Sequence, residues 1–234
     1  MSIFNIGNNK QKRAYTYKEV MLALVIIGIL VAVLLPVTLN KIKKRVLVVK
    51  LQKAYMVLNQ AYFMSHNAND GEPSADYIID NAREYANDYW LRFLGGVKEC
   101  NNHDSCGYLS NTPFKYTKGG NATHSDAFKN NTRFIFQTPD NITFIVFVGT
   151  LNKDEKKSSK IVLVDLNSGA APNKFGEDVF FFIRTDTGFV RPYGFEKSYD
   201  KIQSNCSETG KGTYCAEKIS RDGWVISPDY PIKM

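Results

Sequence analysis

The feature that most constrains this chain is an unbroken apolar stretch of 18 residues from Val20 to Val37. At about 1.5 Å per residue, a helix of this length spans roughly 27 Å, close to the ~30 Å hydrocarbon core of a bilayer. A single carboxylate, Glu19, stands directly before the stretch. Because a charged side chain costs about 2.5–3.5 kcal/mol near the bilayer centre and less toward the interface, a carboxylate here indicates a specific partner. The stretch therefore predicts a membrane-spanning helix with a charged contact at its start.

The residues around Glu19 give the stretch a recognisable context. A polar leader with three cations and no acidic group ends at Ala14 and is followed by Tyr15. The order is basic leader, small residue, aromatic residue, Glu, and then an apolar helix with Gly28 and Pro36. This order resembles the processing site and first helix of type IV pilins and of the pseudopilins of type II secretion systems. The resemblance covers the leader and the chain as far as Pro36.

The resemblance implies how the N-terminus is processed and used. In that family a prepilin peptidase removes the leader on the cytoplasmic side of the membrane and methylates the new amino terminus, so the cut would fall between Ala14 and Tyr15. Residues 15–37 would form the transmembrane and assembly helix. Glu19 would then neutralise the Tyr15 ammonium of a neighbouring subunit, and a paired charge is tolerated in low dielectric where a lone one is not.

The resemblance also implies partners and a location. The partners would be copies of the chain, other pilin-like subunits, the prepilin peptidase and the filament assembly machinery. The chain would be a single-pass protein of the inner membrane with its head in the periplasm or outside the cell, and after assembly it would lie in a filament or at the cell surface. Orientation rests on the resemblance alone, because cations flank both ends of the apolar stretch.

The apolar stretch could also belong to a secretory signal or to an ordinary signal anchor. A conventional secretory signal has an apolar core of about 7–15 residues and an A-x-A-like cut, whereas this core is longer and continues into Thr38–Lys41 without such a site. A signal anchor carrying an unrelated ectodomain is the stronger alternative. It would hold the chain in the membrane without polymerisation.

The helical pattern continues beyond Pro36, which itself predicts a kink or local melting of the helix. Apolar residues recur every three or four positions, as on one face of a helix that runs to about Met64: Leu47, Leu51, Ala54, Tyr55, Leu58, Ala61 and Tyr62. Residues 38–66 are therefore expected to form the second, amphipathic half of one long helix, which rests against a globular head of residues 67–234.

The head is predicted to be helical first and stranded afterwards. A second helix is expected from Tyr77 to Leu94, and β-branched and aromatic runs at Thr132–Gln137 and Ile142–Val148 flank a turn, as in an antiparallel hairpin. Further strands are expected at Lys160–Leu166 and Val179–Arg184. The fold class is thus α+β, a long N-terminal helix packed on a C-terminal antiparallel sheet, which is a pilin-like layout. Trp224 and Tyr230 are expected to close its core.

Four cysteines fall in two close pairs, Cys100 with Cys106 and Cys206 with Cys215. An even count suits disulfides in an exported head, and the local pairing is the simplest of three connectivities. A metal knuckle formed by Cys100, His103 and Cys106 is the competing interpretation, although it supplies only three ligands.

A glycine-containing loop between two predicted strands is rich in side-chain oxygen. Asp165, Asn167, Asn173 and Asp178 offer hard ligands of the kind that Ca²⁺ prefers, although the order departs from an EF-hand. Some pseudopilins carry calcium in a loop of their C-terminal sheet, which supports the analogy. The alternative is a turn whose Asp and Asn side chains cap backbone groups.

Charge and motifs favour an assembly protein over other classes. The net charge of +7 falls to +4 without the three leader cations, and no dense run of Lys and Arg is interleaved with aromatic residues, so nucleic-acid binding is not predicted. No constellation for catalysis is present, and the chain is not expected to be an enzyme. The sequence predicts a structural subunit of a type IV pilus or type II secretion pseudopilus. The alternative is a signal-anchored ectodomain that binds a ligand and does not polymerise.

Overall fold

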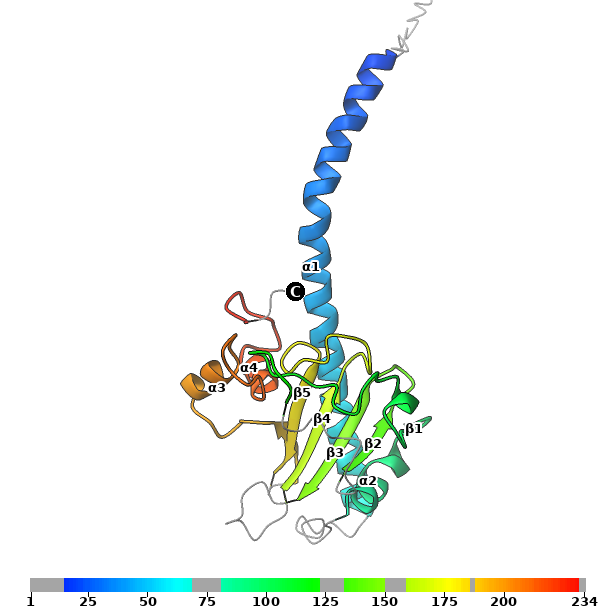
Figure 1. Ribbon diagram of the computed structural model, residues 1–234, viewed down its shortest axis with the longest axis vertical. Coiled ribbons are helices and arrows are strands. Elements are labelled where there is room, and N and C mark those ends of the chain that lie inside the picture. Colours follow the sequence, from blue (N-terminus) through cyan, green and yellow to red (C-terminus); the bar gives the residue numbers. More distant parts are fainter. Residues whose placement is uncertain (1–14, 69–80, 123–132, 150–158, 186–187, 232–234) are drawn as a thin grey trace, which may run out of the picture. The chain divides into compact units, whose positions relative to one another are not determined.

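A computed structural model of the chain describes residues 15–68, 81–122, 133–149, 159–185 and 188–231 (Figure 1). The chain divides into two compact units, residues 1–43 and 44–234. Ala14 lies outside the described residues, as does the first part of the predicted second helix. The helices are α1 (Tyr17–Ala68), α2 (Ala82–Tyr89), α3 (Tyr199–Asn205) and α4 (Cys215–Arg221), with 3₁₀ turns η2 (Leu91–Phe93) and η3 (Asp104–Cys106).

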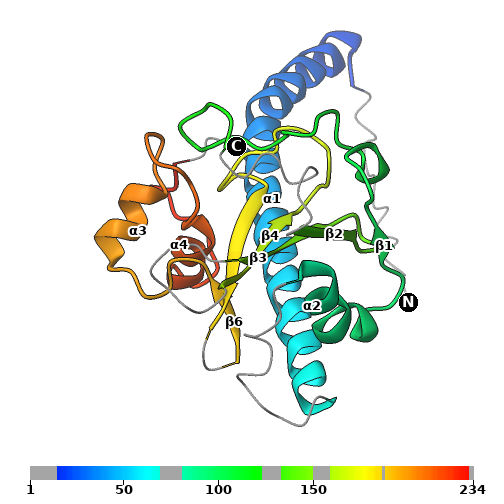
Figure 2. The same ribbon diagram turned by 60° about the horizontal axis from the view of Figure 1, so that its bottom comes forward.

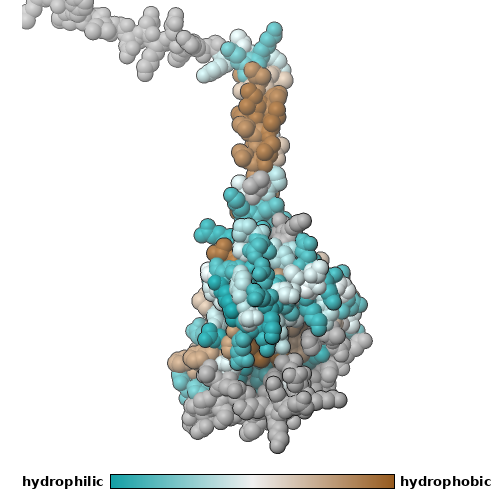
Figure 3. Space-filling view, turned by 90° about the vertical axis from the view of Figure 1, so that its left-hand side faces the viewer, coloured by the Kyte–Doolittle hydropathy of each residue, from teal (hydrophilic) through white to brown (hydrophobic). Residues whose placement is uncertain are grey.

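In the first unit every residue of α1 whose side chain is described is exposed. The large apolar side chains form a hydrophobic band in Figure 3. Within the described residues α1 is the one helix long and apolar enough to cross a membrane. It stays helical through Pro36, so the predicted local melting is not seen. Pro36 has no N–H to donate within the helix. In the same turn, the Thr38 hydroxyl donates to the carbonyl oxygens of Leu34 (3.1 Å) and Leu35 (3.0 Å).

The second unit contains a six-stranded antiparallel sheet in which each strand pairs with the next along the chain. The strands are β1 (Lys98–Glu99), β2 (Arg133–Gln137), β3 (Thr143–Gly149), β4 (Ser159–Asp165), β5 (Val179–Arg184) and β6 (Val190–Pro192). The predicted hairpin is confirmed as β2–β3, where Phe136 is paired with Phe144 and their rings stack 5.1 Å apart. The α+β layout of a long helix followed by an antiparallel sheet is therefore as predicted.

Both faces of the sheet are buried, which explains why its strands read as continuous apolar runs. On β4, Val162 and Val164 point into the core beneath α1, whereas Ile161 and Leu163 point into a second core on the opposite face. Helices α1, α2 and α4 contribute to the first core, and Figure 2 shows α2 and α4 on either side of α1. The second core is closed by the segment from Cys100 to Ala122 and by Phe175.

The predicted stripe on the second half of α1 is the surface that meets the sheet. Five of its seven residues are buried: Leu51, Ala54, Leu58, Ala61 and Tyr62. Leu47 and Tyr55 are half-buried against the same core. Polar contacts fix the helix in register, because Lys50 Nζ donates to the Leu166 carbonyl oxygen (2.9 Å) and the Asn59 amide bonds both the N–H (3.0 Å) and the carbonyl oxygen (3.1 Å) of Val190.

The structure differs from the prediction in its short elements. The second helix, expected from Tyr77 to Leu94, is described only as α2, because Asn81 caps its first turn and the backbone leaves helical geometry at Trp90. The strands β1 and β6 and the helices α3 and α4 were not predicted, since two to seven residues are too few for a periodic pattern. The expectation for the C-terminus is confirmed, since Tyr230 is buried and Trp224 packs against the same core.

The packing of α1 on the sheet predicts a contrast between two substitutions two residues apart. Leu51 is fully buried, so Leu51→Ala should lower the free energy of unfolding of the head by about 2–5 kcal/mol. Val49 is 55% exposed, so Val49→Ala should change it by about 0.5 kcal/mol or less. Chemical denaturation of the full chain in detergent measures both, and equal effects would contradict this packing.

Candidate functional site

The start of α1 places Glu19 in a hydrogen-bonded cap. Its carboxylate oxygen Oε2 accepts from the Thr16 backbone N–H (2.8 Å) and from the Thr16 hydroxyl (3.0 Å). In return, the Glu19 backbone N–H donates to the Thr16 hydroxyl oxygen (3.4 Å). This reciprocal pattern is a capping box, which satisfies N–H groups that have no partner in the first turn of a helix. Glu19 therefore has a role within its own chain.

The other predicted assembly residues lie on the same exposed segment. Tyr15 is 82% exposed, and together with Glu19, Val20, Ala23 and Leu24 it lines a groove along one side of the helix. A side chain added at Gly28 would meet nothing within 4 Å, so packing within the described chain does not explain the glycine. Ala14, the predicted cleavage residue, lies outside the described residues.

The four predicted calcium ligands come together in the connection between β4 and β5. Asp165 accepts a hydrogen bond from the Tyr108 hydroxyl (2.7 Å) and one from the Asn167 backbone N–H (3.1 Å). Asp178 accepts from the backbone N–H groups of Asn173 (2.9 Å) and Lys174 (2.7 Å). When the Asn173 amide is turned to the orientation that satisfies its neighbours, its side-chain nitrogen donates to Asp165 Oδ2 (3.1 Å). The side chains thus hold the turn, as the alternative interpretation predicted.

The electrostatics of this loop favour a cation. Burial, followed by the charge of Asp178, raises the pKa of Asp165 well above its usual value, and burial raises the pKa of Asp178 to about 6. Because the folded state holds these two protons more tightly than the unfolded chain, the contribution of these two carboxyls to the stability of the head is greatest in acid, and that of Asp178 is lost as the pH rises through about 6. A bound cation would offset that loss.

The donor set fits calcium by its chemistry. It offers two carboxylates and amide oxygens, and Asn167 Oδ1 is buried with no hydrogen bond in the described part of the chain. The described residues contain no group of three or more His, Cys, Asp and Glu side chains that could hold a metal. Amide or backbone carbonyl oxygens would therefore have to supply the remaining ligands. Calcium at this loop remains a prediction.

Both cysteine pairs form local disulfides. Cys100 is bonded to Cys106, and Cys206 is bonded to Cys215, which ties the end of α3 to the start of α4. The first bond uses both sulfur atoms that the metal knuckle would need, so the structure favours the disulfide. His103 instead contacts the Tyr108 carbonyl oxygen through Nδ1 (3.1 Å).

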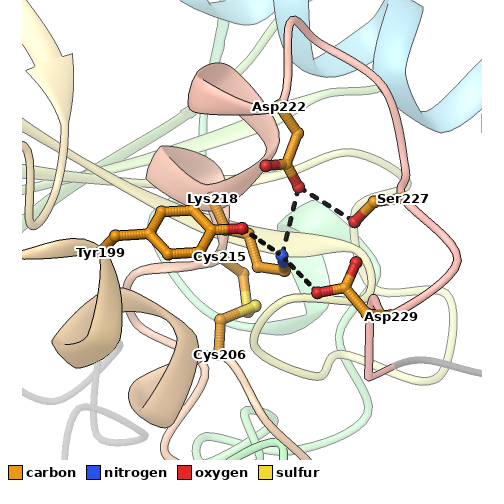
Figure 4. Close-up of polar contacts among 7 residues, drawn as sticks. All are labelled: Tyr199, Cys206, Cys215, Lys218, Asp222, Ser227 and Asp229. Carbon is orange, nitrogen blue, oxygen red and sulfur yellow. Dashed lines mark hydrogen bonds and ion pairs between the residues drawn. A yellow bond between two sulfur atoms is a disulfide. The ribbon is translucent and has the colours of Figure 1, made fainter.

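A buried lysine at the end of the head is a polar centre that was not predicted (Figure 4). The side chain of Lys218 is 1% exposed, and its Nζ lies 3.0 Å from Asp229 and 3.2 Å from Asp222. The Tyr199 hydroxyl oxygen lies 3.5 Å away, and the Ser227 hydroxyl donates to Asp222 (3.0 Å). Burial lowers the pKa of Lys218, but the bonds to Asp229 and Asp222 outweigh it and leave the pKa raised. The cluster joins α3, α4 and the C-terminal segment.

Two of these features had local signals in the sequence. The capping box of α1 is visible as Thr16-x-x-Glu19, and Lys218 with Asp222 has the four-residue spacing of a helical ion pair. The Tyr108–Asp165 contact joins residues that are 57 positions apart in the sequence, so no local pattern could predict it.

Comparisons with protein-family models, with curated proteins and with solved structures find no match for this chain. Its function must therefore be argued from its own residues.

Calcium should stabilise the head if the Asp165–Asp178 loop binds it. At pH 7.5, addition of calcium to the chelator-treated full chain should raise its melting temperature, because a ligand that binds only the folded state adds to its stability. Asp178→Asn should abolish the increase. Glu208→Gln, which removes an equal charge from an exposed loop position, should keep it. An increase of the same size in Asp178→Asn would place the calcium elsewhere.

Removal of the Lys218 cation should destabilise the head because it leaves two carboxylates facing each other. Lys218→Met should cost about 3 kcal/mol, in the range for breaking a buried ion pair. The exposed Lys201→Met should cost about 0.5 kcal/mol or less. Combining Lys218→Met with Asp222→Asn and Asp229→Asn should restore most of the loss. Denaturation curves test this, and a triple variant no more stable than Lys218→Met would contradict the electrostatic origin of the loss.

Proposed function

We propose that this chain is a prepilin-like structural subunit that polymerises through the first half of α1 into a type IV pilus or a type II secretion pseudopilus. The prepilin peptidase would cleave it after Ala14 and methylate Tyr15. The chain would wait in the inner membrane as a single-pass protein until the assembly machinery adds it to the filament. The head would be displayed outside.

The observation that carries the proposal is the exposure of the apolar half of α1. The large apolar side chains from Val20 to Leu35 are 45–63% exposed, and none is covered by another part of the described chain. Exposure of a continuous apolar surface of this length to water is unfavourable, so the segment needs lipid or other helices around it. A subunit that moves from a membrane into a helical bundle has lipid around this segment first and other helices around it afterwards.

The position of Glu19 supports polymerisation over simple anchoring. In a signal anchor, a carboxylate at the edge of the apolar segment would serve only to cap its own helix, and its charge adds to the cost of insertion. In a bundle of identical helices, each Glu19 has a cation available on the neighbouring N-terminus. Gly28 supports the same conclusion, because a position without a side chain allows two helices to approach closely.

The head suits an exported subunit. Both disulfides are of the kind that persists in oxidising compartments, and they fasten segments with little regular structure. The stripe of α1 beneath the sheet ties the head directly to the helix that would build the filament core. A pilus and a pseudopilus share these requirements, so the proposal covers both.

The capping box is the observation that favours the second candidate, a membrane-anchored ectodomain that never polymerises. If Glu19 serves only to cap α1, then its carboxylate needs no partner from another copy. The two functions make different demands on Glu19 and Thr16, and substitutions can separate them.

Glu19→Gln should stop incorporation into filaments, because glutamine still completes a capping box but carries no charge. Thr16→Ala makes the opposite change. It removes the hydroxyl of the cap, at a cost of about 1 kcal/mol in helix stability, and keeps the carboxylate. It should still be incorporated. The measurement is the amount of each variant in sheared surface filaments relative to the amount in the membrane.

Two controls make the comparison specific. Equal membrane levels of both variants exclude a failure of insertion, and Glu84→Gln in the exposed part of α2 is matched in charge. Normal incorporation of Glu19→Gln with poor incorporation of Thr16→Ala would show that Glu19 acts in assembly through capping and not through its charge. Absence of the unchanged chain from sheared filaments, at a normal membrane level, would favour the ectodomain.

A further inference from the structure

The charges of α1 beyond its first turn are all positive. From Val20 to Ala68 the helix has no acidic residue, and it carries six lysines and arginines in that range. Four of the six form a basic segment directly after the apolar stretch: Lys41, Lys43, Lys44 and Arg45. Four like charges within five residues repel one another, so the basic segment calls for an anionic partner.

The head engages the other two cations and leaves the basic segment without a partner. Lys50 Nζ donates to the Leu166 carbonyl oxygen (2.9 Å), and Lys53 Nζ lies 2.8 Å from Asp140 Oδ2. In the basic segment three residues are exposed and Lys44 is partly exposed. Within the part of the chain that the structure describes, none of the four side chains takes part in a hydrogen bond or an ion pair. The partner of the basic segment must therefore come from outside the described chain.

The place of the basic segment along α1 matches the headgroup layer of a bilayer. Residues 20–39 make about 30 Å of helix, which is the thickness of the hydrocarbon core. Thr38 does not interrupt this span, because its hydroxyl donates back to carbonyl oxygens of the preceding turn. From Lys41 to Arg45 the helix rises only about 6 Å, and each headgroup layer is about 5–7 Å thick. All four cations therefore lie at headgroup depth, whereas the two that the head engages lie roughly 13–18 Å farther along the helix.

The directions of the four side chains favour lipids over a protein partner. At about 100° per residue, Lys41, Lys44 and Arg45 lie within about 100° of one another, and Lys43 points to the opposite side of the helix. A protein docked on one side of α1 would leave a cation on the other side unpaired, whereas headgroups are present all around the helix. The exposed Ile42 also suits the interface, because lysine stems can lie along apolar surface while their ammonium groups reach the phosphates.

We propose that the basic segment binds anionic phospholipid headgroups and gathers acidic lipids around α1 on the side of the membrane where the head lies. The Arg45 guanidinium can donate two parallel hydrogen bonds to one phosphate, and each lysine offers a point charge. A zwitterionic headgroup neutralises its own phosphate, so a lipid with net negative charge fits better. One cation near an anionic surface strengthens binding about fivefold. The inference requires that α1 spans a membrane, but it does not require that the chain polymerises.

Spin-labelled lipids test the lipid preference directly. The full chain is reconstituted in phosphatidylcholine vesicles that contain a trace of spin-labelled phosphatidylglycerol or of spin-labelled phosphatidylcholine. The spectrum of each label gives the fraction of that lipid held against the protein. We expect phosphatidylglycerol to be favoured about fivefold, and we expect 1 M salt to reduce this preference because it screens the charges.

Matched variants assign the preference to the basic segment. Replacement of its four cations by glutamine should abolish most of the preference. A variant that keeps the charges, with arginine for each lysine and lysine for Arg45, should retain it. Lys18→Gln, which removes a cation from the other end of the apolar stretch, should also retain most of it. The control removes four exposed cations of the head and should change nothing: Lys118→Gln, Lys197→Gln, Lys201→Gln and Lys211→Gln.

Flotation of the vesicles verifies that each variant is inserted. If the fourfold glutamine variant does not insert, two double variants make the same test: Lys41→Gln with Lys43→Gln, and Lys44→Gln with Arg45→Gln. Each should lose part of the preference. An unchanged preference in the glutamine variants would overturn the inference, as would a loss of the same size in the head control. Absence of any preference in the unchanged chain would overturn it as well.

The outcomes separate this inference from the proposed function. If the glutamine variants keep the lipid preference while the unchanged chain is found in filaments, the inference fails and the proposed function stands. If the preference depends on the basic segment while the unchanged chain still begins at Met1 and is absent from filaments, the inference stands and the proposed function fails.

Discussion

The structure depends on one helix whose two halves have different surroundings. From Val20 to Leu35, α1 is apolar on every side and exposed on every side, which in water would be unfavourable along its whole length. From Val48 onward the same helix buries a single face, and the sheet covers it. The two halves of α1 therefore have different packing requirements. The first half needs a partner that the described chain does not supply, and the second half has one.

The head is built to hold that second half firmly. Alternate residues of β2 to β5 face the helix, and the remaining ones face a second core covered by an irregular segment and closed by a disulfide. The polar groups of the head are mostly engaged. The carboxylates of the β4–β5 connection hold backbone N–H groups, and Lys218 neutralises two aspartates beside the C-terminal segment. These contacts hold the β4–β5 connection in its turn and the C-terminal segment against α4.

Sequence patterns predicted the features that local periodicity controls. The apolar stretch, the stripe from Leu47 to Tyr62 and the hairpin at Phe136 and Phe144 are repeated over enough residues to identify their structure. Short elements such as β6 and α4 were not predicted, because their positions depend on contacts with residues distant in sequence. The loop oxygens were recognised, but their engagement by Tyr108 depends on the fold. Glu19 shows why a residue type alone is ambiguous. Its carboxylate caps its own helix, and the same carboxylate is the group proposed to pair with a cation of a neighbouring subunit.

The account depends most on the claim that the chain is processed as a prepilin and then assembled. Intact mass and N-terminal peptide analysis of the protein from its native membrane and from sheared surface material test this claim directly. The account predicts a chain that begins at N-methylated Tyr15 in the sheared fraction. A chain that still begins at Met1, in cells whose prepilin peptidase is active on other substrates, would contradict it and leave the membrane-anchored ectodomain.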